Sequence, residues 1–363
     1  MAVATRPEGL VPFDYELPPG LIAQEPARER GDSRLMLVRR RSDTAAARAG
    51  GAAVDPADAL VRDLPGLLRS GDLLVVNRSR VIAARLRCQR LPGGGSSEIL
   101  LVAPCENRIG EERVLWRALG RPAKRLEPGR RLRAGDLELE IVARDGAWLE
   151  VAFPPGLDVI AALESRGEVP LPPYIRRATG TTDADRIRYQ TVFAREPGSV
   201  AAPTAGLHLS EALLEVLRSS GVGVAEIVLH VGPATFLSGL PGRSPVLPEP
   251  ERYLIPPATR AAISATRAAG GRVVAVGTTT TRALEAAAHA GWPSDWATTA
   301  LVIAAGHEFQ VVQGLLTNFH LPGTSLLALV AAFAGNETAR RAYEIAVERR
   351  YRFYSYGDAM LIL

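Results

Sequence analysis

The chain has 363 residues, 47% of them hydrophobic and 23% charged, which is the composition of an ordinary globular protein with ample core material. Its first residues carry no charged region followed by an apolar run, and no apolar stretch approaches the roughly 20 residues of a membrane span. The two cysteines, Cys88 and Cys105, show neither metal-site nor disulfide spacing. We therefore expect no secretory signal, no membrane anchor and a location in the reducing cytoplasm.

The charge of the chain is moderately basic. The net charge is +4, and all but one of the 43 basic residues are arginine, the exception being Lys124. Arginine binds phosphate through forked hydrogen bonds, so this bias is compatible with an RNA partner. A GC-rich genome that replaces lysine by arginine explains the same bias, so the charge is only weak support for RNA binding.

The first part of the chain predicts the start of an α/β domain, followed by a change of character. A turn and short strand are expected over 32–38, an irregular surface loop over 41–58 and a short helix over 59–68. Six short apolar runs separated by turn residues follow, at 73–76, 81–88, 98–103, 114–118, 137–142 and 148–153. Because no convincing helix lies between them, they predict a small antiparallel β-barrel.

After residue 155 helical and strand patterns alternate, which is typical of a layered α/β domain. Helices are expected over 157–165, 210–219, 258–269, 280–290, 325–334 and 337–350. Strands are expected over 224–230, 273–276, 301–304 and 359–363. The predicted fold is an α/β main domain, residues 1–70 and 155–363, with an inserted small antiparallel β-barrel domain over 71–154.

Four loops in the second half of the chain combine small or hydroxyl residues with a histidine or arginine, at 198–208, 229–236, 277–282 and 316–322. Small residues let a backbone pass close to a ligand, and a histidine there can exchange protons near neutral pH. A lone histidine is more often an ordinary core residue. Because three of the five histidines lie in these loops, we expect one composite active site containing His208, His230 and His320.

The run of four threonines before Arg282 follows an apolar strand that ends at Gly277, so it predicts the start of a helix. A helix N-terminus offers free N–H groups and partial positive charge, which suit a carboxylate or a phosphate. Consecutive threonines are poor helix formers, so local stability alone does not favour them. A plain threonine N-cap explains the run equally well.

Other common active-site patterns are absent from the sequence. There is no Gly-x-Ser-x-Gly elbow, and the glycine-rich stretch 93–95 lacks the context of a phosphate-binding loop. No pair of histidines has the close spacing of a typical zinc motif and no cysteine joins them, so no metal is expected. We interpret His289, inside a helical pattern, as structural, and we leave the role of His307 open.

Two arginine-containing segments are candidates for RNA contact. Arg176 and Arg177 follow an extended proline-rich stretch. Arg350 and Arg352 lie among aromatic residues, a mixture that grips phosphates and stacks on bases. A crossing between domains explains the first segment equally well, and a solvated helix end that runs into an aromatic cluster explains the second.

Taken together, these segments resemble the S-adenosylmethionine:tRNA ribosyltransferase-isomerase family of queuosine biosynthesis. Motifs spread over nearly the whole chain carry the resemblance, at 13–18, 21–24, 34–35, 71–77, 84–86, 170–177, 189–194, 202–208, 229–232, 276–279, 315–322 and 351–360. The family fold is an α/β domain with an inserted β-barrel, in agreement with the elements above.

The resemblance implies an enzyme that uses S-adenosylmethionine as a ribosyl donor. The acceptor is the aminomethyl group of 7-aminomethyl-7-deazaguanine at the wobble position of tRNA, and the product is epoxyqueuosine in tRNA, with release of adenine and methionine. S-adenosylmethionine is then a substrate, no cofactor is implied, and we expect a monomer. The chemistry requires a base near the ribose C5′, help for the departure of adenine and a neutral amine nucleophile.

Site residues are carried over at matching positions. The expected catalytic residues are His208, His230 and His320. The expected substrate-binding residues are Tyr189, Gln190, Thr204, Gly206, Thr235, Thr278, Thr279, Arg282 and Asn318, with Thr278, Thr279 and Arg282 suited to the methionine carboxylate. The expected RNA-binding residues are Arg176, Arg177, Arg350 and Arg352.

Three segments depart from the family pattern, at 77–80, at 247–253, where a histidine-rich stretch is usual, and in the loop after Phe236. They leave the donor side intact and bear on the acceptor. One alternative is therefore a paralogue that uses the same donor on a free deazapurine or another small amine. A second alternative is a non-catalytic RNA-binding protein, which would not need the histidine and threonine loops.

Overall fold

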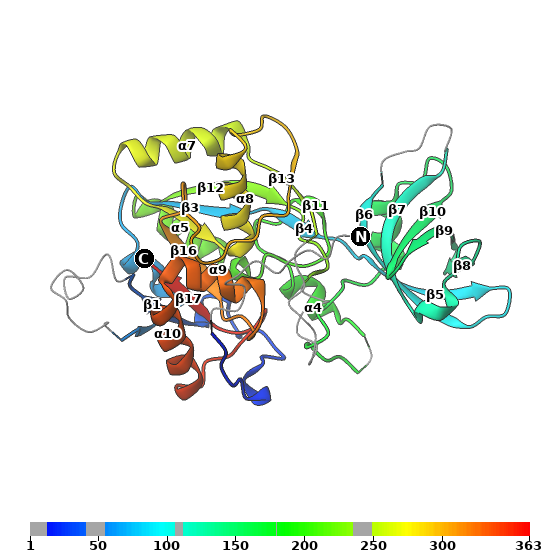
Figure 1. Ribbon diagram of the computed structural model, residues 1–363, viewed down its shortest axis with the longest axis horizontal. Helices are drawn as coiled ribbons and strands as arrows, with labels where there is room; N and C mark the ends of the chain where they lie inside the picture. Colours follow the sequence, from blue (N-terminus) through cyan, green and yellow to red (C-terminus); the bar gives the residue numbers. More distant parts are fainter. Residues whose placement is uncertain (1–12, 41–54, 106–111, 179, 235–248) are drawn as a thin grey trace.

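The computed structural model describes residues 13–40, 55–105, 112–178, 180–234 and 249–363. Figure 1 shows a large body of mixed helices and strands and, beside it, a smaller body made of strands. Within the described ranges no helix is long and apolar enough to cross a lipid bilayer.

The large body is built on a nine-stranded sheet with the order β15-β13-β12-β3-β14-β16-β17-β1-β2. In that order the strands are Ala297–Thr299, Glu251–Leu254, Gly223–Leu229, Leu73–Asn77, Val273–Val276, Gly314–Asn318, Ala359–Ile362, Arg34–Val38 and Ala57–Leu60. The centre is parallel, because β3 pairs in parallel with β12 and β14, and β14 with β16. The last strand, β17, pairs antiparallel with β16 and parallel with β1.

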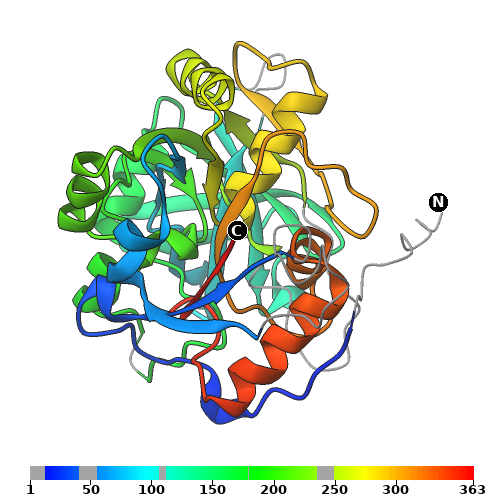
Figure 2. The same ribbon diagram turned by 90° about the vertical axis from the view of Figure 1, so that its left-hand side faces the viewer.

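Helices and short helical turns cover both faces of this sheet (Figures 1 and 2). The α-helices are α2 Leu64–Leu67, α3 Val159–Arg166, α4 Asp183–Arg188, α5 Glu211–Ser219, α7 Pro257–Ala268, α8 Thr278–His289, α9 Ser325–Ala334 and α10 Asn336–Glu348. The 3-10 turns are Pro19–Leu21, Arg30–Asp32, Val61–Asp63, Ala123–Arg125 and Thr204–His208.

Strand β3 shows how the two faces are filled. Successive side chains of a strand point to opposite faces. Leu73 and Val75 pack in one core with residues of α7 to α10, and Leu74 and Val76 pack in a second core with α2 and α5. Every residue of β3 is buried, as expected for a parallel strand that is covered on both sides.

The small body is a closed antiparallel barrel with the order β10-β7-β6-β5-β8-β9. Its strands are Trp148–Phe153, Val114–Arg121, Ser96–Pro104, Arg85–Leu91, Arg131–Ala134 and Leu137–Asp145. A separate two-stranded sheet joins β4, Ser79–Val81, to β11, Glu196–Ser199. In Figure 1 these two strands lie between the large body and the barrel.

The predicted fold class, an α/β domain with an inserted antiparallel barrel, is confirmed by this topology. The run 73–76, which we expected in the barrel, is instead strand β3, near the centre of the large sheet. The barrel strands therefore begin at Arg85 rather than near residue 71. The sixth barrel strand is β8, whose short arginine-leucine alternation over 131–134 did not stand out as an apolar run.

Smaller corrections concern element type. The expected helix over 59–68 begins as strand β2, continues as a 3-10 turn and ends as the short helix α2. Residues 301–304 are not a strand, and the nearby strand is β15 at Ala297–Thr299. The sequence patterns also did not predict β13 or β16, and most of the expected surface loop 41–58 lies outside the described residues.

Candidate active site

A cavity opens where several central strands end. Its lining comes from the segments that follow β12, β14 and β16, from the loop 201–205 and from residues 301–303. The carboxyl ends of parallel strands are where α/β sheets bind ligands. The sequence loops that we expected to form one site therefore do meet at one edge of the sheet.

Helix α8 begins at this cavity. Gly277, with φ of 92°, ends the strand and precedes the helix, and Thr278 and Thr279 line the cavity. The hydroxyls of the next two threonines are used locally, since Thr280 Oγ1 donates to Val276 O at 2.7 Å and Thr281 Oγ1 to Gly277 O at 3.1 Å. The threonine run thus divides into two residues that face the cavity and two that stabilise the helix start.

Arg282, one turn into α8, is held by a buried ion pair. Its Nη1 lies 2.6 Å from Oε2 of Glu251, and its Nε donates to the carbonyl of Leu301 at 2.8 Å. Oε1 of Glu251 accepts from the backbone N–H of Gly232 at 2.9 Å. The pair therefore ties α8 to β13 and to the segment after β12, and it leaves Nη2 of Arg282 as the remaining donor group.

His320 lies on the cavity wall directly after β16. Its Nε2 is 2.9 Å from Oγ1 of Thr317, and its backbone N–H donates to the hydroxyl of Tyr343 at 3.0 Å. Burial lowers the pKa of His320 to about 4. The ring is therefore neutral at physiological pH.

His208 lies behind the cavity and does not line it. Its Nε2 is 3.0 Å from Nδ2 of Asn318, which does line the cavity, and the same Nδ2 donates to the carbonyl of Tyr354 at 3.1 Å. Burial, with the positive charges of Arg352 and Arg30, lowers the pKa of His208 to about 3. His208 thus reaches the cavity only through Asn318.

His230 faces a second pocket, between the barrel and the large body. Its ring stacks on Trp296 with centroids 5.0 Å apart, and a Cβ on Gly198 would come within 2.6 Å of it. Burial, helped by the charge of Arg252, lowers the pKa of His230 to about 4. The structure therefore does not gather all three histidines around one cavity, although the two pockets are adjacent and share Gly232 and Glu251.

Four buried polar atoms of residues that line the first cavity lack a hydrogen-bond partner in the described part of the chain. They are Oγ1 of Thr279, Nη2 of Arg282, Oδ1 of Asn318 and the hydroxyl of Tyr189. A buried polar group without a partner costs roughly 1–3 kcal/mol, so native proteins keep few of them without a functional reason. Two of these atoms lie at the start of α8, so the cavity is prepared for a polar and at least partly anionic ligand.

The other expected substrate-binding residues divide into two groups. Tyr189 and Thr204 line the cavity. Gln190 does not line the cavity, because both polar atoms of its side-chain amide bond to the backbone of Val81. Its Nε2 donates to Val81 O at 2.7 Å, and its Oε1 accepts from Val81 N at 3.0 Å. Gly206 is also set back, since a Cβ there would meet the ring of Phe193 at 2.8 Å. Thr235 lies outside the described residues.

Comparison with known proteins identifies the family. The family model described as "Queuosine biosynthesis protein" matches residues 10–362. The chain belongs to this family. It is 49% identical over 356 residues to the S-adenosylmethionine:tRNA ribosyltransferase-isomerase of Azoarcus sp. (strain BH72), with 96% of each chain covered. It is 47% identical over 357 residues to the protein of that name from Anaeromyxobacter sp. (strain Fw109-5), covering 96% of this chain and 97% of that one.

A solved structure supports the same family assignment. The crystal structure of an S-adenosylmethionine tRNA ribosyltransferase from Thermotoga maritima matches with a TM-score of 0.53 and 36% sequence identity, over 97% of this chain and 100% of that one. The resemblance carried by the sequence motifs, and with it the assignment to this family of enzymes, is confirmed.

Two of the four arginines expected at RNA are engaged internally. Arg177 makes two 2.8 Å hydrogen bonds to the carboxylate of Asp185. The Arg352 guanidinium contacts Asp358 with Nη2 at 3.1 Å. Arg176 and Arg350 are exposed. Arg177 and Arg352 therefore make ion pairs within the protein, and RNA contact stays a prediction for all four arginines.

The sequence reasoning missed Glu251, the buried partner of Arg282. It lies in the segment 247–253, which we noted only for the histidines it lacks. A signal was present, because alternation over 251–254 places Glu251 on the same strand face as the buried Tyr253. An acidic residue on a buried face requires a partner, and in the structure that partner is Arg282.

Proposed function

We propose that this protein transfers and isomerises the ribosyl moiety of S-adenosylmethionine onto 7-aminomethyl-7-deazaguanine at the wobble position of tRNA, releasing adenine and methionine. Family membership and the names of its close relatives support the reaction class. Of the observations on the molecule, the unpartnered buried atoms of Thr279, Arg282 and Asn318 in one cavity carry the proposal.

These atoms suit the methionine end of the donor. A carboxylate at the start of α8 would accept from the hydroxyl of Thr279, from Nη2 of Arg282 and from free backbone N–H groups. Oδ1 of Asn318 can only accept, so it suits an ammonium, a hydroxyl or an exocyclic amine. Donor and acceptor groups on one cavity wall match a zwitterionic ligand better than a purely anionic one.

His320 is the best placed base for the proposed chemistry. The sulfonium of S-adenosylmethionine acidifies the protons at the ribose C5′, and a neutral imidazole can remove one of them. Among the three expected histidines, His320 alone lines the first cavity, and burial keeps it neutral. His208 is then a positioning residue, because it acts on the cavity through Asn318.

The second pocket suits the acceptor base. It lies between the barrel and the large body and is lined by Trp116, Arg117 and Trp148 on the barrel side and by His230 on the other. Aromatic side chains provide stacking surfaces for a nucleobase. Because this pocket shares Gly232 and Glu251 with the donor cavity, an amine bound in one could reach a ribose bound in the other.

The test is a reaction of the purified protein with S-adenosylmethionine and tRNA that carries 7-aminomethyl-7-deazaguanine. Mass spectrometry of the digested nucleosides should show epoxyqueuosine in place of the starting base. A parallel reaction with the free base tests the small-molecule acceptor. Conversion of the free base with no change in the tRNA would overturn the proposed acceptor while keeping the donor chemistry.

A further inference from the structure

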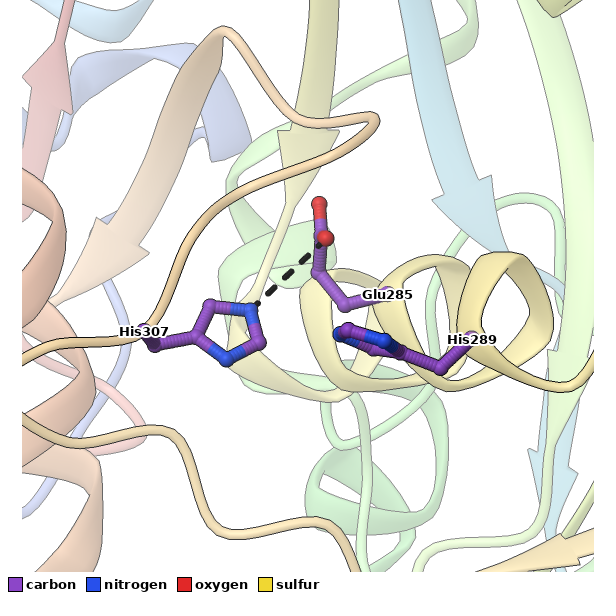
Figure 3. Close-up of side chains that lie close together, drawn as sticks. All are labelled: Glu285, His289 and His307. Carbon is purple, nitrogen blue, oxygen red and sulfur yellow. Dashed lines mark ion pairs between the residues drawn. The ribbon is translucent and has the colours of Figure 1, made fainter.

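Three side chains with metal-binding atoms lie together outside both pockets. They are Glu285 and His289, four residues apart on α8, and His307 from the segment after β15, and their ligand atoms all lie within 4.8 Å of one another. Residues four apart share one face of a helix. Figure 3 shows His307 reaching from its loop toward the two side chains on α8.

The carboxylate of Glu285 is fixed by three backbone donors of the facing segment. Oε2 accepts from Gln310 N at 2.8 Å, and Oε1 accepts from Val311 N at 3.1 Å and Val312 N at 2.9 Å. The side chain is fully buried. A metal ligand that is already held by hydrogen bonds loses little entropy when it binds an ion.

The imidazole of His307 lacks a hydrogen-bond partner for one nitrogen. Its Nε2 is buried and unpartnered within the described residues, and it lies 3.7 Å from Oε2 of Glu285, beyond hydrogen-bond distance. The ring packs edge-on against Phe309 and lies 5.7 Å from the ring of His289, centroid to centroid. The side chain of His289 is exposed, so solvent has a path to the cluster.

We propose that Glu285, His289 and His307 form a binding site for a divalent transition-metal ion of the zinc class. Two imidazoles and one carboxylate favour zinc, cobalt or nickel over magnesium and calcium, which prefer oxygen ligands. Neighbouring ligands in a tetrahedral site with bonds of about 2.1 Å lie about 3.4 Å apart. The 3.7 Å between His307 and Glu285 is close to that spacing, and rotation of the His289 side chain completes the set.

The proposed metal site is connected to the first cavity through helix α8 and the segment that begins at Leu301. Arg282, one turn before Glu285, lines the cavity and bonds to the carbonyl of Leu301, and residues 301–303 line it as well. An ion bound to α8 and to His307 would tie the segment 301–312 more firmly to the helix. The site is therefore structural or regulatory, and it does not depend on which substrates the enzyme uses.

The test uses tag-free protein, freed of metal and titrated with Co²⁺, with the visible absorbance of the bound ion as the readout. We expect one equivalent to bind, with resistance to excess Mg²⁺. His307→Ala and His289→Ala should each weaken binding by about tenfold or more. Glu308→Gln is the matched control, because it changes an exposed neighbour of His307 outside the cluster, and it should bind as the native chain does.

A second measurement compares each protein with and without the ion, so a difference in stability between the variants does not affect the result. Zn²⁺ should raise the melting temperature of the native chain and of Glu308→Gln, because an ion that binds only the folded state stabilises it. The increase should vanish in His289→Ala, whose side chain can be removed without leaving a closed cavity. Absence of stoichiometric Co²⁺ binding, or binding in both histidine variants equal to that of the native chain, would overturn the proposal.

Discussion

His208 and Asn318 are joined by a buried contact of 3.0 Å between Nε2 of the ring and Nδ2 of the amide. The same Nδ2 donates to the carbonyl of Tyr354, which fixes the orientation of the amide, because a carbonyl can only accept. Nε2 of His208 must then accept, so the ring is neutral and carries its proton on Nδ1. Oδ1 of Asn318 is left as an acceptor in the first cavity.

The first prediction follows from this pair. His208→Ala removes the acceptor that orients Asn318, so the KM for S-adenosylmethionine should rise, by an amount equivalent to about 1–3 kcal/mol of binding. His208→Gln offers an amide oxygen in place of Nε2 and should restore part of the affinity. A purely structural role would instead lower the stability of both variants in parallel and leave the KM unchanged, which chemical denaturation with steady-state kinetics can distinguish.

The threonines at the start of α8 give a second prediction. Thr279→Val removes a hydroxyl that faces the cavity without a protein partner, so it should raise the KM for S-adenosylmethionine and leave the fold intact. Thr281→Val is the matched control, because its hydroxyl bonds to Gly277 O within the helix start. The control should lower thermal stability slightly with little effect on the KM. Equal kinetics in the two variants would contradict this division of the threonine run.

The buried pair Glu251–Arg282 gives a third prediction. Glu251→Ala leaves the guanidinium of Arg282 buried without its partner, so the free energy of unfolding should drop by roughly 3–5 kcal/mol. Glu344→Ala removes a partner of the exposed Arg340 and is the control, with an unfolding midpoint close to that of the native chain. Urea denaturation of the three proteins measures the difference. A small effect of Glu251→Ala would mean that water or another group compensates Arg282.

A fourth prediction concerns pH. Burial lowers the pKa of His208 to about 3 and those of His230 and His320 to about 4, from 6.5. Between pH 6.5 and 4 the unfolded chain therefore binds protons that the folded chain does not. The free energy of unfolding should fall as the pH falls through this window, by up to about 1.4 kcal/mol per pH unit for each histidine. Urea titrations at a series of pH values test this, and a flat profile across the window would contradict it.

The fifth prediction concerns tRNA. Arg176 and Arg350 are exposed, so Arg176→Gln and Arg350→Gln should weaken tRNA binding. Each should also make the dependence of log K on log salt less steep, by about 0.7–0.9 for every phosphate that the variant no longer neutralises. Arg177→Gln should act differently and lower stability, because Arg177 is paired with Asp185. An unchanged salt slope in both exposed-arginine variants would place the RNA surface elsewhere.

The fold class could be predicted because the spacing of hydrophobic residues and the positions of turn residues are local properties of the chain. Helix α8 and strand β14 were expected nearly where they lie, since an apolar run followed by Gly277 and threonines marks the junction. Strand β3 was assigned to the wrong body because a fully buried run looks the same in a barrel and in a parallel sheet. Its pairing with β12 and β14 shows that it belongs to the large sheet, and the residues of the run do not specify which strands they pair with.

The sequence indicated which loops form the candidate site, but it did not indicate how far each residue lies from the cavity. The sequence predicted one composite site from the loops that contain Thr279, Asn318 and His320, because small residues, threonines and histidines recur in them. The structure places these three residues on one cavity wall, where strand ends meet at one edge of the sheet. The sequence could not show that His208 lies behind Asn318, since that depends on how the turn Thr204–His208 packs. The cluster around His307 could not be predicted either, because His307 comes from a different segment than Glu285 and His289.

The most direct test of the central claim is the product balance of the reaction with S-adenosylmethionine. We predict release of adenine and methionine in equal amounts, and only when the tRNA acceptor is present, because the ribosyl moiety is transferred. Liquid chromatography of the small-molecule products measures both in one run. S-adenosylhomocysteine as the main product would contradict the account, because it would show that the methyl group was transferred instead.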